Sequence, residues 1–354
     1  MNHSLKALAL VAIGMATLPA TASELIFSTW GGSYQDAQNA TAVRPFASQS
    51  GTKVKIDTYN GGIAQIRSQV ETKNVTWDVV DMQLADATRA CDEGLLEKIN
   101  PASLPAASTG AAAKADFMPG GLSDCMVGNI AWSTVITYNK NAFKGAEPTK
   151  IADFFDLKRF PGKRGLRKSP EAALEWALLA DGVPAADVYK TLATPDGLKR
   201  AFKKLDTIKS SIVWWETGAQ PPQLLADGEV TMTSAYNNRI YVAATQDKKP
   251  FGFLWDGEVK NIEGYAIVKG SKNLKAAQDF IRHSTSTESL AKLASATALG
   301  PLRQSSVKLV DPKVAPYLPT APQNQKNAID TNIAFWADHS DDLNQKFAVW
   351  LGQK

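Results

Sequence analysis

The stretch ELIFSTWGGSYQDAQ, residues 24–38, contains the structural unit that recurs along the chain. Its first five residues are mostly apolar, which predicts a short strand. The pair Gly31-Gly32 then breaks the strand, and Ser33 belongs to the residue types that cap helices, so we expect a helix over residues 34–51. A strand, a glycine turn and an amphipathic helix together are typical of α/β proteins.

The same alternation continues to the end of the chain. Residues 78–82 (DVVDM) are nearly continuous in apolar character, as in a buried parallel strand. The mature chain of about 331 residues is long enough for two domains. Further strands are expected at 53–59, 130–138, 230–234 and 265–269, and helices at 63–73, 86–93, 151–155, 172–180, 185–192, 197–208, 238–246, 274–283, 287–296 and 328–353.

The first 23 residues have the layout of a secretory signal. Lys6 precedes an apolar run over residues 8–18, and Ala20-Thr21-Ala22 has the small-residue spacing of a cleavage site. The run is shorter than the ~20 residues that span a bilayer, and no Cys follows it for a lipid anchor. We therefore expect export to the periplasm, with cleavage after Ala22 or Ser23.

The balance of charge argues against a nucleic-acid partner. The chain has 39 basic and 35 acidic residues, and loss of Lys6 with the signal leaves 38 and 35, a net charge of +3. The basic segment 158–168 has one aromatic residue and no nucleic-acid-binding motif, so we interpret it as a solvated loop.

Two cysteines, Cys91 and Cys125, remain to be explained. An even number of cysteines in an exported protein favours a disulfide. The alternative is a metal or redox pair, but the sequence has neither C-x-x-C spacing nor a neighbouring His.

The motifs of the common enzyme and nucleotide-binding classes are absent. The chain lacks G-x-x-x-x-G-K-[ST] and G-x-G-x-x-G. Gly32-Ser33 resembles part of a nucleophile elbow, but Gln35 stands where that motif requires Gly. We therefore predict a protein that is not an enzyme and has no catalytic residues, cofactor or metal; a periplasmic enzyme on an α/β fold is the alternative from another class.

Several short motifs, in order, carry a resemblance over nearly the whole mature chain. The chain resembles the extracellular solute-binding proteins of ABC transporters, in the branch close to the spermidine/putrescine-binding proteins. The motifs are STWGGSY (28–34), YNGG (59–62), TWDVVD (76–81), CDEGLL (91–96), VGNIAWST (127–134), FPGKRG (160–165) and GYAI (264–267).

This resemblance implies the type II periplasmic-binding-protein fold, with two α/β lobes, hinge crossovers and a ligand cleft between the lobes. We assign residues 24–133 and 263–302 to lobe 1, and residues 134–262 and 303–354 to lobe 2. The lobes of such a protein close around a small-molecule solute by a hinge motion, and an inner-membrane ABC permease receives it. We expect a monomer.

Ligands of open α/β sheets lie beyond the carboxyl ends of the strands, which points to residues 30–34, 83–86, 214–216 and 236–238. In the polyamine-binding pattern, Trp30 and Tyr236 match aromatic positions of the cleft. Glu263 matches a carboxylate that pairs with an ammonium group. The predicted ligand-binding residues are Trp30, Gly32, Ser33, Tyr34, Gln83, Asp86, Trp132, Glu171, Trp215, Tyr236, Asn237 and Glu263.

These residues also have structural interpretations. Trp30, Trp132 and Trp215 are equally suited to a hydrophobic core. Glu263 suits a structural ion pair, and Glu171 suits the first turn of a helix, where the dipole favours negative charge.

The expected ligand is a cationic amine of the polyamine type, but three features depart from that pattern. The segment 261–263 lacks an aromatic residue two positions before the acid, and the segment 83–85 lacks a Tyr. The backbone N–H groups of 31–33 suit an anion better than an amine. The alternative is the same scaffold with an opine, an amino-acid derivative or an organic acid.

Overall fold

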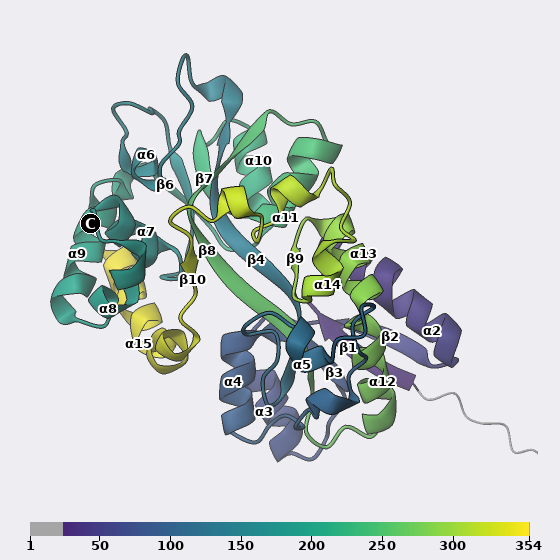
Figure 1. The fold of residues 1–354 in the computed structure, drawn as a ribbon. Coiled ribbons are helices and arrows are strands. Elements are labelled where there is room, and N and C mark those ends of the chain that lie inside the picture. The colour runs from purple at the N-terminus through teal and green to yellow at the C-terminus, as the bar shows by residue number, and fades with distance from the viewer. Residues whose placement is uncertain (1–23, 354) are drawn as a thin grey trace, which may run out of the picture.

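The computed structural model describes residues 24–353, so the predicted signal segment lies outside the described residues. Its centre is a sheet with the strand order β2-β1-β3-β8-β4-β7-β5-β6, to which β10 and β9 add at β8 and β4 (Figure 1). The strands are β1 (Glu24–Thr29), β2 (Lys53–Thr58), β3 (Val79–Gln83), β4 (Met126–Asn139), β5 (Arg164–Arg167), β6 (Ile212–Trp215), β7 (Met232–Tyr236), β8 (Phe251–Ile267), β9 (Gly300–Pro301) and β10 (Ile329–Asp330).

Two long strands, β4 and β8, connect two separate parallel groups. β8 pairs with β3 from Val79↔Ile267 to Gln83↔Glu263, whereas β4 pairs with β7 from Thr134↔Tyr236 onward. We call the part built on β1–β3 lobe 1 and the part built on β5–β7 lobe 2; Figure 1 shows them at the lower right and the upper left. The residue limits predicted for the two lobes remain a proposal.

Helices cover both lobes. Those at residues 151–155, 172–180, 274–283 and 287–296 were predicted within two residues of their ends. Around lobe 1 lie α1 (Gly32–Gln38), the π-helical η1 (Asn39–Val43), α2 (Arg44–Ser50), α3 (Ala64–Glu71), α4 (Leu84–Asp92), α5 (Ala113–Asp116), α12 (Leu274–Ser284), α13 (Thr287–Thr297) and α14 (Gln304–Val307). Around lobe 2 lie α6 (Ile151–Phe155), α7 (Ala173–Ala180), α8 (Val188–Leu192), α9 (Pro195–Asp206), α10 (Gln220–Ala226), α11 (Asn237–Tyr241), the π-helical η6 (Val242–Gln246) and α15 (Ile333–Gly352).

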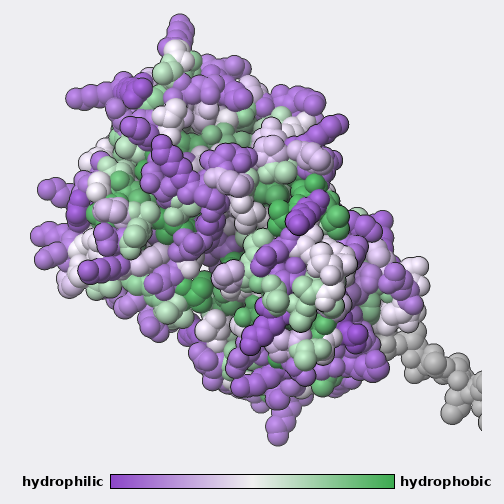
Figure 2. Space-filling model, viewed as in Figure 1, coloured by the Kyte–Doolittle hydropathy of each residue, from purple (hydrophilic) through white to green (hydrophobic). Residues whose placement is uncertain are grey.

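Each lobe has an apolar core of its own. Phe27 and Phe280 pack together in lobe 1, with ring centroids 5.0 Å apart, and Phe154 and Trp176 are fully buried in lobe 2. Polar residues cover most of the face in Figure 2, and apolar residues show between them and where the lobes meet. Within residues 24–353, no helix is long and apolar enough to cross a membrane.

The predicted disulfide is confirmed. Cys91 at the end of α4 is bonded to Cys125 immediately before β4, with the Cα atoms 5.8 Å apart. The bond fastens a helix of lobe 1 to the start of a strand that crosses between the lobes.

The solvated loop predicted for the basic segment 158–168 is right only in part, because Lys158, Arg159, Lys163 and Lys168 are exposed but the segment also contains a strand. Residues 164–167 form β5, and Arg164 is fully buried. Its guanidinium donates hydrogen bonds to the carbonyl oxygens of Phe154, Gly162 and Phe160. Hydrogen bonds to backbone carbonyl oxygens thus compensate for the burial of a guanidinium group that we expected to be solvent-exposed.

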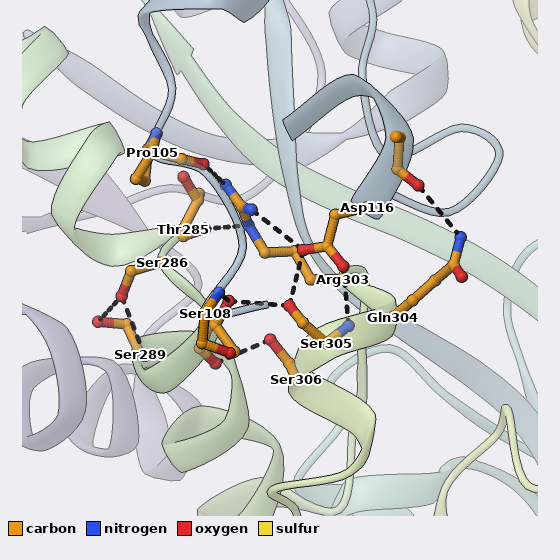
Figure 3. A network of polar contacts seen from close by, with 12 residues as sticks. Pro105, Ser108, Asp116, Thr285, Ser286, Ser289, Arg303, Gln304, Ser305 and Ser306 are labelled. Atoms are coloured by element: carbon orange, nitrogen blue, oxygen red, sulfur yellow. Dashed lines mark hydrogen bonds and ion pairs between the residues drawn. The ribbon is translucent and has the colours of Figure 1, made fainter. Parts of the chain in front are cut away.

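A buried ion pair anchors the chain after β9. Arg303 donates to Asp116 Oδ2 at 3.1 Å and to the carbonyl of Thr285 at 2.6 Å, and Ser305 donates to the same carboxylate (Figure 3). Asp116 and Thr285 adjoin helices of lobe 1. The residues directly after β9 therefore hydrogen-bond to lobe 1, although the sequence assigned them to lobe 2.

Candidate functional site

A cavity of about 260 Å³ lies where the two lobes meet. Its walls come from the carboxyl ends of strands in both lobes and from the two crossing strands, which is where open α/β sheets bind ligands. The lining residues are Trp30, Tyr34, Tyr59, Asn60 and Gln83 from lobe 1; Ile130, Trp132 and Glu263 from β4 and β8; Arg167, Glu216, Thr217, Gly218, Tyr236, Asn238 and Arg239 from lobe 2; and Leu299 before β9.

Aromatic rings form much of the wall. Tyr236 meets Trp132 edge-on, with ring centroids 5.2 Å apart, and meets Trp215 edge-on at 5.7 Å. Trp30 packs against Tyr59 at 4.9 Å. The indole Nε1 of Trp30 is buried and has no hydrogen-bond partner within residues 24–353. The Trp132 side chain, by contrast, lowers the pKa of Glu263 by hydrogen bonding to its carboxyl group. The cavity therefore combines aromatic surface with an unused N–H donor on Trp30.

Charges of both signs face the cavity. Arg167 and Arg239 form no ion pair within 4 Å with any carboxylate of the described chain, and Glu263 forms none with a described cation. Glu216, by contrast, is paired with Lys168 at 3.1 Å. The cavity thus has one carboxylate and two guanidinium groups that lack charged partners.

A buried carboxylate supports the wall from behind. Asp81 Oδ2 accepts hydrogen bonds from Tyr34 Oη at 2.9 Å and Gln38 Nε2 at 2.6 Å, and Oδ1 accepts from Asn129 Nδ2 at 3.2 Å. Burial raises the pKa of Asp81 to about 7, against the lowering effect of these hydrogen bonds. Tyr34, which lines the cavity, is thereby fixed in orientation.

The pKa of Glu263 lies well above its usual range. Burial is the largest cause, and the negative charge of Asp81 is the next. In the β3–β8 pairing, Asp81 is opposite Tyr265 and Gln83 is opposite Glu263, so the two carboxylates are diagonal neighbours on one face of the sheet. The negative charge of Asp81 therefore disfavours ionisation of Glu263.

Six of the twelve predicted ligand-binding residues line this cavity: Trp30, Tyr34, Gln83, Trp132, Tyr236 and Glu263. The structure brings them together from residues as far apart as 30 and 263. Their role in ligand binding remains a prediction.

The other six lie outside the lining. Asp86 accepts a hydrogen bond from the backbone N–H of Gly62 at 3.0 Å, and Glu171 accepts one from Asn261 at 2.9 Å. The fully buried Trp215 donates to Ser234 and packs behind Tyr236.

Asn237 is buried and connects α11 to β4 and to the segment before β9. It accepts from the N–H of Ser133 at 3.1 Å and donates to the carbonyl of Ala298 at 2.8 Å. The remaining two, Gly32 and Ser33, lie at the start of α1, beside Arg239. Ser33 does not cap that helix as predicted; its Oγ accepts a hydrogen bond from Arg239 Nη1 at 2.8 Å instead.

Sequence reasoning missed the two arginines. Arg167 ends β5, a strand that the sequence analysis took for a loop, so the carboxyl-end rule was not applied to it. Arg239 lies one residue beyond the predicted loop 236–238. Tyr59 and Asn60 follow β2 directly, and the same rule applied there would have found them.

The model of the bacterial extracellular solute-binding protein family matches residues 41–320. The chain belongs to this family. A gamma-aminobutyric acid (GABA)-binding protein of Pseudomonas aeruginosa is 39% identical over 338 residues, which are 96% of this chain and 94% of that protein.

Solved structures of solute-binding proteins agree with the fold. A GABA receptor structure is 36% identical, covers 94% of this chain and 98% of its own, and has a TM-score of 0.82. The binding protein MotA of A. tumefaciens B6, in complex with glucopine, is 33% identical, covers 93% and 99%, and has a TM-score of 0.83. A spermidine/putrescine-binding protein of Streptococcus pneumoniae, 14% identical with a TM-score of 0.72, shares the fold alone.

These findings confirm the type II periplasmic-binding-protein fold and the solute-binding family predicted from the sequence. The protein is a periplasmic solute-binding component of an ABC importer, which works with a membrane permease, and it is not an enzyme. The expectation of a polyamine ligand finds less support than its alternative, because the more similar proteins are named for GABA and glucopine.

Proposed function

We propose that the protein captures a small zwitterion with separate ammonium and carboxylate groups, of the kind represented by GABA. The observation that carries this proposal is the charge pattern of the cavity. Within residues 24–353, Glu263 has no cationic partner within 4 Å, and Arg167 and Arg239 have no anionic partner within 4 Å. The nearest acid that acts on Arg167 is Glu171, whose pKa the arginine lowers. A bound molecule with both charges would compensate all three groups.

The ammonium end fits the β8 side of the cavity. A desolvated cation needs a carboxylate and gains from aromatic faces, each cation–π contact contributing about 0.5–2 kcal/mol. Glu263 supplies the carboxylate, and Trp132 and Tyr236 supply rings beside it in the lining. The raised pKa of Glu263 means that ammonium binding would release a proton from the site wherever that carboxyl is protonated.

The carboxylate end fits the arginines. Guanidinium groups form the strongest hydrogen bonds to carboxylates, and the unused indole N–H group of Trp30 adds a neutral donor. A diamine would place its second ammonium group near Arg167 and Arg239, where like charges repel. This is the physical reason for replacing the polyamine hypothesis.

The volume of the cavity favours a small ligand. About 260 Å³ is slightly below the 300–1,000 Å³ of common ligand pockets. An amino acid of GABA's size suits this space. Opines remain the second candidate, because the glucopine complex of MotA has the same fold at 33% identity.

Isothermal titration calorimetry tests the proposal. The panel comprises GABA, 5-aminovalerate, glucopine, butyrate, butylamine and putrescine. We expect a zwitterion to bind at least 10-fold more tightly than butyrate or butylamine, because each of these lacks one charged end. Tighter binding of putrescine than of every zwitterion contradicts the proposal, and tighter binding of glucopine than of GABA selects the second candidate.

A further inference from the structure

One of the side chains that line the cavity reaches from lobe 2 to lobe 1. Arg239, from α11 of lobe 2, donates from Nη1 to Oγ of Ser33, from α1 of lobe 1, at 2.8 Å. Its guanidinium also lies over Gly32: a Cβ atom at that position would be 3.1 Å from Nη1 and 3.3 Å from Nη2. The absence of a side chain at residue 32 therefore lets the arginine cross from one lobe to the other.

This contact leaves the charge of Arg239 uncompensated. A guanidinium has five donor hydrogens, and the Ser33 hydroxyl is a neutral acceptor. No described carboxylate lies within 4 Å of Arg239, and the side chain is half-buried. Bringing the lobes together without a ligand therefore buries a cation that has no anion beside it.

We infer that the ligand's carboxylate supplies that anion, and that Ser33 and Gly32 act through Arg239 to make lobe closure depend on it. This inference rests on the proposed function. A ligand drives a conformational change only through its different affinities for the two states. A carboxylate on Arg239 stabilises the closed state, in which the arginine also reaches Ser33. A simple amine can occupy the Glu263 side of the cavity but leaves Arg239 unpaired, so the lobes stay apart.

Ser33 is a positioning residue in this scheme, and Ser33→Ala is the first test. Affinity is measured by calorimetry and closure by the radius of gyration in small-angle X-ray scattering, with GABA and butylamine as probes. We expect GABA to reduce the radius of gyration of the wild type and butylamine to leave it unchanged. Ser33→Ala should weaken GABA binding by about 2- to 10-fold, the range for one lost hydrogen bond, with less than a 2-fold change for butylamine.

The control is Ser68→Ala, an exposed serine on α3 for which we expect unchanged values. A second pair of variants tests the space above Gly32. Gly32 and Gly51 both have positive φ, of 60° and 70°, but only Gly32 has Arg239 against its missing Cβ, while Gly51 has nothing within 4 Å. Gly32→Ala should therefore weaken GABA binding more than Gly51→Ala, and should prevent the fall in the radius of gyration.

The outcomes separate the two hypotheses. If the wild type binds no zwitterion, the proposed function fails and this inference fails with it. If the wild type binds GABA and closes, but Ser33→Ala and Gly32→Ala bind and close like their controls, the inference alone is overturned. Closure of the wild type with butylamine overturns it as well.

Discussion

Tyr34 Oη donates a 2.9 Å hydrogen bond to Asp81 Oδ2, which connects the cavity wall to a carboxylate with no solvent exposure. Tyr34 comes from α1 and Asp81 from β3, so one contact aligns the helix after the first strand with the centre of lobe 1. Asp81 also accepts hydrogen bonds from the side-chain amides of Gln38 and Asn129. These hydrogen bonds and the one from Tyr34 favour the ionised carboxylate. Desolvation disfavours the ionised carboxylate more strongly than the hydrogen bonds favour it, so the pKa of Asp81 is raised to about 7.

Asp81→Asn should therefore change the pH dependence of stability. The pKa of Asp81 is higher in the folded protein than the usual 3.9 or so of an unfolded chain, so folding favours the protonated carboxyl. The stability that this group contributes is complete below pH 4 and is lost as the pH rises to about 7. The difference in unfolding free energy, wild type minus Asp81→Asn, should fall by a few kcal/mol over this range.

Urea denaturation at several pH values measures this difference, with the exposed Asp36→Asn as the control. If the difference in unfolding free energy between wild type and Asp81→Asn does not change with pH, as expected for Asp36→Asn, Asp81 is ionised in the folded protein over the whole range and the prediction is wrong.

Glu263→Gln should weaken ligand binding but stabilise the ligand-free protein. Loss of a charge-assisted contact with the ammonium group, about 1.5–3 kcal/mol, corresponds to a 10- to 150-fold rise in Kd for GABA. The ligand-free variant should nevertheless unfold at a higher temperature at pH 7.5, because a buried carboxylate with a raised pKa has been replaced by a neutral amide.

Calorimetry and thermal denaturation check the two halves of this prediction. The exposed Glu229→Gln is the matched control, and the thermal gain should disappear near pH 4.5, where the wild-type carboxyl is protonated. If Glu263→Gln binds GABA as tightly as the wild type, Glu263 does not contribute to ligand binding.

Asp116→Ala should be strongly destabilising. Arg303 is fully buried, and removal of Asp116 leaves its guanidinium without a counter-charge, for which about 3–5 kcal/mol is usual. Asp124→Ala, which removes an exposed pair with Lys98, should cost less than about 1 kcal/mol. Equal losses of unfolding free energy in urea would contradict the importance assigned to the buried pair.

The disulfide should stabilise the fold without contributing to the site. Closing a loop of 34 residues between Cys91 and Cys125 contributes roughly 3–4 kcal/mol in the chain-entropy treatment. Neither cysteine lines the cavity. Replacement of both by serine should lower the unfolding free energy by about this amount and change the Kd for GABA by less than 2-fold, and a larger change in Kd would show that the bond shapes the cleft.

Local pattern was sufficient to predict the three parallel strands of lobe 1. β1, β2 and β3 were predicted within one residue of their observed ends, because apolar alternation and glycine turns depend on neighbouring residues alone. The same pattern failed for β5 and for the first part of β8. In β5 the charged Arg164 is satisfied by the carbonyl oxygens of Phe154 and Phe160, 10 and 4 residues before it, and apolar periodicity does not reveal such side-chain contacts to the backbone.

The sequence by itself determined the α/β class, the disulfide, and the aromatic and acidic half of the candidate site, including Trp30, Tyr236 and Glu263. Only the tertiary structure decided that Arg167 and Arg239 face the same cavity without acidic partners. It likewise turned Ser33 from an expected helix cap into the acceptor for an arginine 206 residues away. The physical reason is that charge compensation acts between side chains close in space, and spacing along the chain carries no information about a partner on the other lobe.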